Sequence, residues 1–313
     1  MKKFAFLLTA VTALSACQVS AENPVWNKAY GGADKSYDSQ LLSLREQIAP
    51  KFQQFEFKDK KTGKTLAYNL YIPKNLDPQK SYPLVMFIAD ASTAGKGVLA
   101  PLMQGYGGII WATDEAQAKN PAFVLVPAFS QVAVQDDWST TDEVGMALRL
   151  FKNIVRNYPI DPARLYTTGQ SMGGMISFYL NSIEPDLFTA SMFVGSQWDI
   201  NVLKPLTKAK FIYTVSAGDQ KASKGMAQVI DLMKQNNVPY TETELSAKLP
   251  QSEQNSEVSK ILAQGKNANF IRFTPNTVVP ATASGKNGSE HMYSFDYAYL
   301  LEPAREWLLT QKK

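Results

Sequence analysis

The residues at 167–175, TTGQSMGGM, place Ser171 between Gly169 and Gly173 in the G-x-S-x-G spacing. Glycines at these positions let neighbouring backbone pass close to a sharp bend, which would hold the serine oxygen exposed at its corner. The preceding residues RLYTTGQ favour a short strand, and the following MGGMISFYLNSI favours a helix. The pattern predicts a nucleophilic serine on a strand-to-helix turn. The alternative is a chance match in an ordinary loop.

A serine hydroxyl is a weak nucleophile and needs a base within hydrogen-bond reach, most often a histidine. The chain has one histidine, His291, in GSEHMYSFDYAYL shortly before the last expected helix. An isolated surface histidine is the alternative interpretation. The position after the serine and next to the final helix favours His291 as the base.

A carboxylate should orient the imidazole and stabilise its cationic form. Asp219, in FIYTVSAGDQKAS, directly follows an apolar run typical of a buried strand and is the first candidate. It could equally be the N-cap of the helix that follows. Asp199 in SQWDI is the reserve candidate, and Asp296 is expected to cap the last helix.

The elements that position these residues follow from hydrophobic spacing. Short apolar runs (LVMFI, FVLV, MFV and FIYTV) predict buried strands, and segments with helical spacing, such as residues 144–158 and 172–183, lie between them. This alternation predicts an α/β domain over residues 51–313, with a mostly parallel, doubly wound sheet and helices on both faces. Alternating residues around KKTGK predict an antiparallel N-terminal hairpin. The polar stretch 239–288 is interpreted as an insertion that could form a lid.

The N-terminal residues MKKFAFLLTAVTALSAC are typical of an export signal. Two outcomes stay open: a signal peptide over residues 1–21, or a leader of residues 1–16 followed by a lipidated Cys17. Residues 22–50 would then be a spacer. The protein is expected outside the cytoplasm, either as an outer-membrane lipoprotein held to the membrane by its lipid or as a periplasmic or secreted protein.

Composition limits the classes of binding partner and cofactor to be expected. The formal net charge is +4 with 19% charged residues and no long basic block, which argues against nucleic acid. One histidine and one cysteine offer no nitrogen- or sulfur-rich metal site, and no cofactor is expected.

The sequence resembles the α/β-hydrolase superfamily, within it the predicted-peptidase and polyhydroxybutyrate-depolymerase-like esterase group. The resemblance rests on YNLYIPKNLDPQKSYPLVMFI, IDPARLYTTGQSMGGM and EHMYSFDYAYLLEPAREWL. It implies an oxyanion hole that includes the backbone N–H of Met172. Relatives carry His-Gly where this chain has Ala89 and Asp90, and Ala91 is the expected second donor. A carboxylate at Asp90 would repel an oxyanion unless it points away or is paired.

These residues predict acyl transfer to water: hydrolysis of a small-molecule or polymeric ester through an acyl-enzyme. Peptide hydrolysis by the same residues is one alternative. A membrane-tethered binding protein with an altered oxyanion loop is another. Trp198 and Trp138 are candidates for the substrate pocket, although aromatic residues of this kind often belong to the core.

Overall fold

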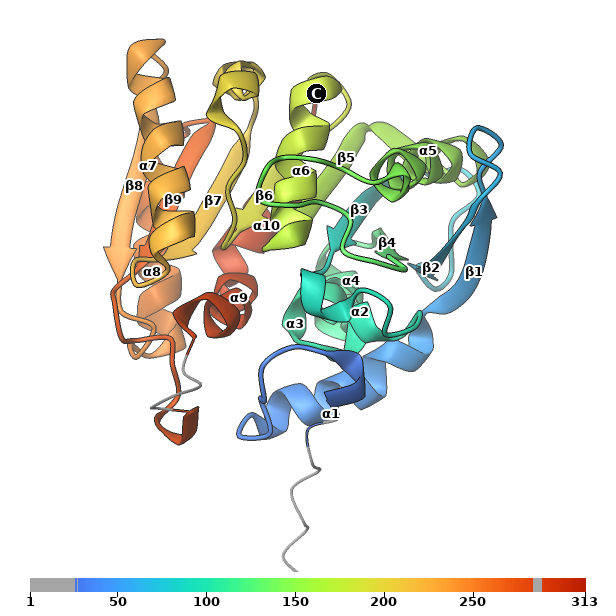
Figure 1. Cartoon of the computed structure of the whole chain (residues 1–313), viewed down its shortest axis with the longest axis horizontal. Helices are drawn as coiled ribbons and strands as arrows, with labels where there is room; N and C mark the ends of the chain where they lie inside the picture. The colour runs from blue at the N-terminus through green and yellow to red at the C-terminus, as the bar shows by residue number, and fades with distance from the viewer. Residues whose placement is uncertain (1–25, 27, 284–288) are drawn as a thin grey trace, which may run out of the picture.

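The computed structural model describes residues 26, 28–283 and 289–313. The expected leader and Cys17 lie outside the described residues. Nine strands form one sheet in the order β1-β2-β4-β3-β5-β6-β7-β9-β8 (Figure 1). Their bounds are β1 Gln53–Lys58, β2 Thr65–Tyr71, β3 Tyr82–Ile88, β4 Phe123–Ala128, β5 Ile160–Gln170, β6 Ala190–Val194, β7 Phe211–Ser216, β8 Tyr240–Leu245 and β9 Ala268–Phe273.

The direction of the strands matches the predicted fold class. β2 pairs antiparallel with both β1 and β4, and every other neighbouring pair is parallel. The antiparallel hairpin and the mostly parallel sheet are therefore confirmed.

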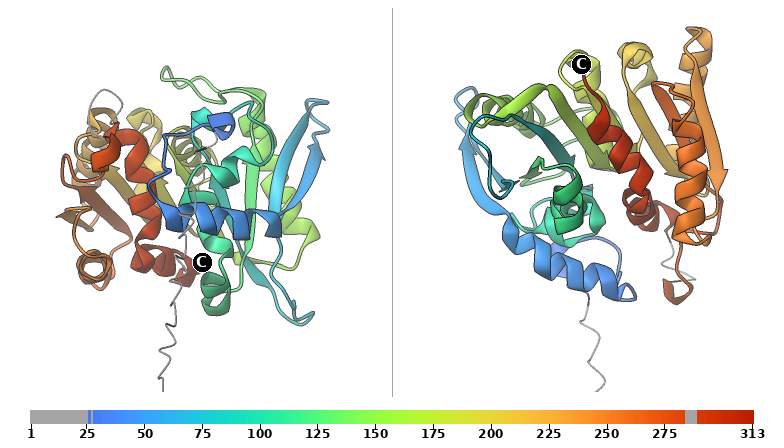
Figure 2. Two further views of the ribbon diagram at one scale, coloured as in Figure 1. Left: turned by 90° about the horizontal axis from the view of Figure 1, so that it is seen from below. Right: turned by 180° about the vertical axis from the view of Figure 1, so that it is seen from behind.

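Helices cover both faces of the sheet, because successive side chains of its buried strands point to opposite sides. In β3, Leu84, Met86 and Ile88 join the core under α5, α6 and α7, whereas Val85 and Phe87 join the core under α1, α8 and α10. The right-hand view of Figure 2 shows α1, α8 and α10 from behind. The helices are α1 Ser39–Ile48, α2 Ala100–Met103, α3 Tyr106–Ile109, α4 Asp114–Lys119, α5 Asp142–Asn157, α6 Met172–Ile183, α7 Gln220–Gln235, α8 Gln251–Leu262, α9 Glu290–Leu300 and α10 Glu302–Thr310.

The described part of the expected spacer, residues 26 and 28–50, belongs to the domain, so this interpretation needs correction there. Trp26 is buried, and α1 buries Leu41 and Ile48 in the core behind the sheet. The Lys35 side chain is fully buried and forms an ion pair with Asp296 of α9, with Nζ 2.6 Å from Oδ2. The sequence of this segment is polar and did not indicate the packing, because its polar groups bind partners far along the chain.

The stretch 239–288, expected to be an insertion or lid, also needs correction. Its described part contains β8, α8 and β9, and β9 lies between β7 and β8 in the sheet. β8 is an edge strand that buries Thr241 and Leu245 but exposes Glu242. One exposed face makes such a strand polar in sequence, so apolar runs alone did not detect it.

Within the part of the chain that the structure describes, no helix combines the length and apolar character needed to cross a membrane.

Candidate active site

Ser171 lies between β5 and α6 with backbone angles φ 50° and ψ −118°. This is a strained conformation for a residue with a side chain. Its N–H donates to the Val194 carbonyl at 3.0 Å. A Cβ on Gly169 would lie 2.3 Å from the backbone of Gly173, and a Cβ on Gly173 would lie 1.9 Å from the Ile88 carbonyl oxygen. Both glycines are required by close backbone approach, as the sequence predicted.

The structure brings the three residues of the expected triad together. His291 Nε2 lies 2.8 Å from Ser171 Oγ, and His291 Nδ1 lies 2.5 Å from Asp219 Oδ2. Asp219 is also the N-cap of α7, since its Oδ1 accepts from the N–H of Ala222 at 3.2 Å. Asp219 therefore contacts the imidazole and also caps the helix that follows it. His291 itself stands in the first turn of α9, with Ser289 as the N-cap.

Buried aromatic residues support this arrangement. The ring of Phe295 packs edge-on against the His291 imidazole, with centroids 4.9 Å apart. Burial raises the pKa of Tyr213 well above its usual value, with a smaller contribution from the charge of Asp219. The Tyr213 hydroxyl therefore stays protonated and donates to the Ser196 carbonyl. The Tyr213 hydrogen bond ties β7 to the segment that follows β6.

The residues expected to form the oxyanion hole follow neighbouring strands. Met172 opens α6, and Ala91 opens a short 3-10 turn, Ala91–Thr93, just beyond β3. In the register of the sheet, Ile88 of β3 lies opposite Gly169 of β5, so both loops begin at the same edge. This placement is what a pair of backbone donors beside Ser171 requires.

The carboxylate of Asp90 is paired. It is 2% exposed, and its Oδ1 accepts from the backbone N–H and the hydroxyl of Ser92, the former at 2.9 Å. Its Oδ2 accepts from Gln170 Nε2 at 2.9 Å. The Asp90 carboxylate thus accepts from donors on the loop of Ala91 and on Gln170, the residue before Ser171.

A pocket of about 330 Å³ opens onto Ser171 and His291. It is lined by Asp136, Ser171, Met175, Gln197, Asp219, Lys221 and His291. Lys221 Nζ lies 2.5 Å from Asp136 Oδ2, so an exposed ion pair forms part of the wall.

The two tryptophans proposed for substrate binding are not among the residues that line this pocket. Trp198 is 4% exposed and belongs to the core. Trp138 is 36% exposed and packs against Trp198, with ring centroids 5.4 Å apart.

The other aspartates have different partners. Asp199 caps a short turn by accepting from the N–H of Asn201 at 3.0 Å. Asp296 lies inside α9 rather than at a cap, where it pairs with Lys35 and accepts from the N–H of Tyr106 at 2.9 Å. The expected cap is wrong, because the chain is already helical from Glu290 onward.

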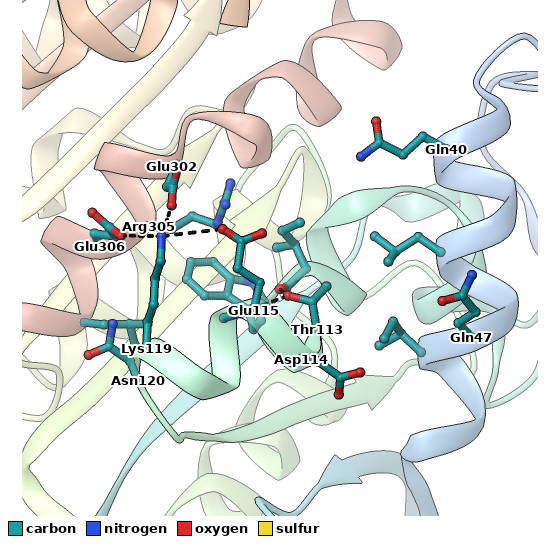
Figure 3. A pocket seen from close by; sticks show the side chains of 16 residues that line it. Gln40, Gln47, Thr113, Asp114, Glu115, Lys119, Asn120, Glu302, Arg305 and Glu306 are labelled. Atoms are coloured by element: carbon teal, nitrogen blue, oxygen red, sulfur yellow. Dashed lines mark hydrogen bonds and ion pairs between the residues drawn. The ribbon is translucent and has the colours of Figure 1, made fainter. Parts of the chain in front are cut away.

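A second pocket, of about 310 Å³, shares no lining residue with the first and lies between α1, α4 and α10 (Figure 3). Lys119 stands among Glu115, Glu302 and Glu306 there, and the hydrogen bonds that its ammonium donates to the last two raise its pKa. The Lys119 ammonium thus forms ion pairs with all three carboxylates. Over the described residues, no group of three or more His, Cys, Asp or Glu side chains could hold a metal ion.

The sequence matches no family model and no curated protein. A thermostable esterase superposes with a TM-score of 0.64 at 21% identity, covering 85% of this chain and 64% of that one. This chain therefore spans less than two thirds of that esterase. A mutant of the feruloyl esterase module from Clostridium thermocellum, complexed with sinapinate, gives a TM-score of 0.53 at 12% identity and covers 83% and 89% of the two chains.

A peptidase is also similar in structure. Porphyromonas gingivalis dipeptidyl peptidase 4 superposes with a TM-score of 0.51 at 13% identity, covering 80% of this chain and 35% of that one. Together with the strand order and the sharp turn at Ser171, these similarities define the class of protein by its fold. The chain has the α/β-hydrolase fold, which confirms the resemblance at that level.

Proposed function

We propose that this protein is a serine hydrolase that cleaves carboxylic esters. The observation that supports it best is the continuous chain of contacts from Ser171 Oγ through both nitrogens of His291 to Asp219, at 2.8 and 2.5 Å. Each spacing suits a hydrogen bond that could carry or stabilise a proton.

In the proposed reaction, His291 Nε2 accepts the hydroxyl proton of Ser171 as Oγ attacks the ester carbonyl carbon. The N–H groups of Met172 and Ala91 would stabilise the resulting oxyanion. The imidazolium then returns its proton to the departing alkoxide, which leaves an acyl-enzyme and a free alcohol. Water, deprotonated by His291, attacks the acyl-enzyme; the acid leaves as the imidazolium returns that proton to Ser171 Oγ. Asp219 keeps the imidazole in the productive tautomer and stabilises its cationic form.

The pocket favours a small ester substrate. Its volume of about 330 Å³ lies at the lower end of the roughly 300–1,000 Å³ typical of small-molecule sites. A pocket of this size accommodates a short acyl chain more readily than a long one. We therefore expect acetate and propionate esters to be hydrolysed faster than octanoate esters.

The direct test uses a fluorophosphonate probe and p-nitrophenyl acetate. We expect wild type and Ser259→Ala, a serine variant on the exposed side of α8, to be labelled and active. Ser171→Ala should lose both properties while remaining folded by circular dichroism. Labelling that persists in Ser171→Ala, or a folded wild type that is neither labelled nor active, would overturn the proposal. Peptide anilides tested alongside distinguish an esterase from a peptidase.

A further inference from the structure

The residue before the histidine, Glu290, connects two loops at the edge of the site. Its Oε2 accepts from the hydroxyl of Ser216 and from the N–H of Gly218, the latter at 3.1 Å. Its Oε1 accepts from the N–H of Asn276 at 2.6 Å. One carboxylate thus receives three hydrogen bonds: one from the last residue of β7, one from the loop after β7 and one from the loop after β9.

The backbone of the first loop lies directly against the Glu290 carboxylate. A Cβ on Gly218 would lie 2.1 to 2.2 Å from the carboxyl atoms of Glu290. No side chain fits at that position while the carboxylate stays in place. The loop backbone and Glu290 therefore pack directly on each other.

This packing involves both partners of the histidine–aspartate pair. Asp219 directly follows Gly218, and His291 directly follows Glu290. The Glu290 carboxylate therefore ties the backbone that carries the aspartate to the helix that carries the histidine. The Nδ1 to Oδ2 contact of 2.5 Å depends on how these two segments sit relative to each other.

We propose that Glu290 is a positioning residue for the proposed active site, holding Asp219 against His291. The inference rests on the proposed function, because a hydrogen bond between these two side chains matters for rate only if His291 acts as the base. Glu290 itself does not line the pocket of Ser171. It acts through the other two residues.

The alternative is that Glu290 only stabilises the N-terminus of α9. An acidic residue in the first turn stabilises a helix through its dipole, whatever its side chain touches. Glu253 provides the matched control, since it is an exposed acidic residue in the first turn of α8. Glu253→Gln should leave activity unchanged.

The experiment measures kcat and KM for p-nitrophenyl acetate in four proteins: wild type, Glu290→Gln, Asp219→Asn and the double variant. Glutamine keeps the size of the side chain but can accept on one oxygen only. We expect Glu290→Gln to lower kcat by about 10- to 100-fold, since small displacements of catalytic groups have effects of this size. KM should change little. In the Asp219→Asn background the same substitution should lower kcat by less than about threefold, because residues that act as a unit are not additive.

A spectroscopic measurement provides an independent readout. Since the chain has one histidine, every imidazole resonance of a histidine-labelled sample belongs to His291. The Nδ1 proton, hydrogen-bonded to Asp219, should give a downfield signal in wild type and Glu253→Gln. That signal should shift or broaden in Glu290→Gln. Should Glu290→Gln unfold, Ser216→Ala removes one donor to the carboxylate and tests the same link more mildly.

The outcomes separate the two proposals. A wild-type activity that depends on Ser171, with Glu290→Gln as fast as wild type, would overturn the positioning role alone. An equal loss in the wild-type and Asp219→Asn backgrounds would also overturn it, since the residue would then act by another route. Absence of any activity dependent on Ser171 would instead overturn the proposed function.

Discussion

Replacement of Lys35 by methionine tests whether the N-terminal segment is essential to the domain. The Lys35 side chain is 0% exposed and that of Asp296 is 9% exposed, and the two form an ion pair at 2.6 Å. Methionine occupies similar space without the charge. It would leave the Asp296 carboxylate buried with the N–H of Tyr106 as its remaining hydrogen-bond donor.

The expected magnitude follows from this environment. Removing one partner of a buried ion pair costs about 3–5 kcal/mol, because the other charge is left without compensation. Because Tyr106 still donates to the Asp296 carboxylate, we expect Lys35→Met to lower the free energy of unfolding by about 3 kcal/mol, near the lower end of this range. That loss corresponds to a decrease in Tm of about 6–12 °C for a domain of this size. Asp296→Leu should cost more, because the ammonium makes no hydrogen bond to another described residue.

Urea unfolding followed by tryptophan fluorescence measures these changes. Lys64→Met is the control, since it breaks an ion pair with Asp142 whose side chains are 60% and 56% exposed. No measurable change is expected there, as for most exposed pairs. The double variant Lys35→Met/Asp296→Leu should be more stable than either single variant, because no unpaired charge remains. Single losses as small as that of Lys64→Met, adding up in the double variant, would refute the reasoning.

Three further predictions concern glycine packing, acid stability and the oxyanion loop. Gly173→Ala should abolish ester hydrolysis and lower Tm, since its Cβ would lie 1.9 Å from the Ile88 carbonyl oxygen; retained activity would contradict the sharp turn. Hydrogen bonds from Arg149 hold the pKa of Asp59 well below its usual value, so this pair stabilises the fold above about pH 4 and loses that effect as the pH falls. Arg149→Met should therefore lower the urea midpoint most at pH 7 and by a smaller amount at pH 3, where part of the pair's effect has been lost, whereas an equal deficit at both pH values would argue against the pair. Asp90→Ala should lower kcat by about 10-fold or more with little change in KM, and unchanged kinetics would show that this carboxylate does not order the loop.

The parts of the fold predicted well are those that local sequence determines. Gly169 and Gly173 reveal the turn because their own backbone neighbours exclude a side chain. The central strands are recognisable because both of their faces are buried, which makes them continuously apolar. His291 could be assigned because the chain has no other histidine.

The parts predicted poorly depend on contacts between distant segments. Lys35 looks like an ordinary surface lysine until Asp296 is placed beside it. Glu290 looks like a helix-capping carboxylate until the loop of Gly218 is brought against it. The pocket residue Lys221 likewise gives no signal of its own in the sequence.

The same long-range contacts involve Asp90, a residue of the expected oxyanion loop that differs from the relatives. A binding protein with an impaired oxyanion hole was a serious alternative because Asp90 brings a negative charge to the loop. That charge is held by donors from Ser92 and Gln170, and Ser92 in turn accepts from the N–H of Gly32 at 2.8 Å. Since Gly32 lies only three residues before Lys35, the N-terminal segment supports the expected oxyanion loop on one side and the helix of the histidine on the other. These hydrogen bonds hold the loop in one conformation and give the Asp90 carboxylate partners. We therefore favour the enzyme over the binding protein.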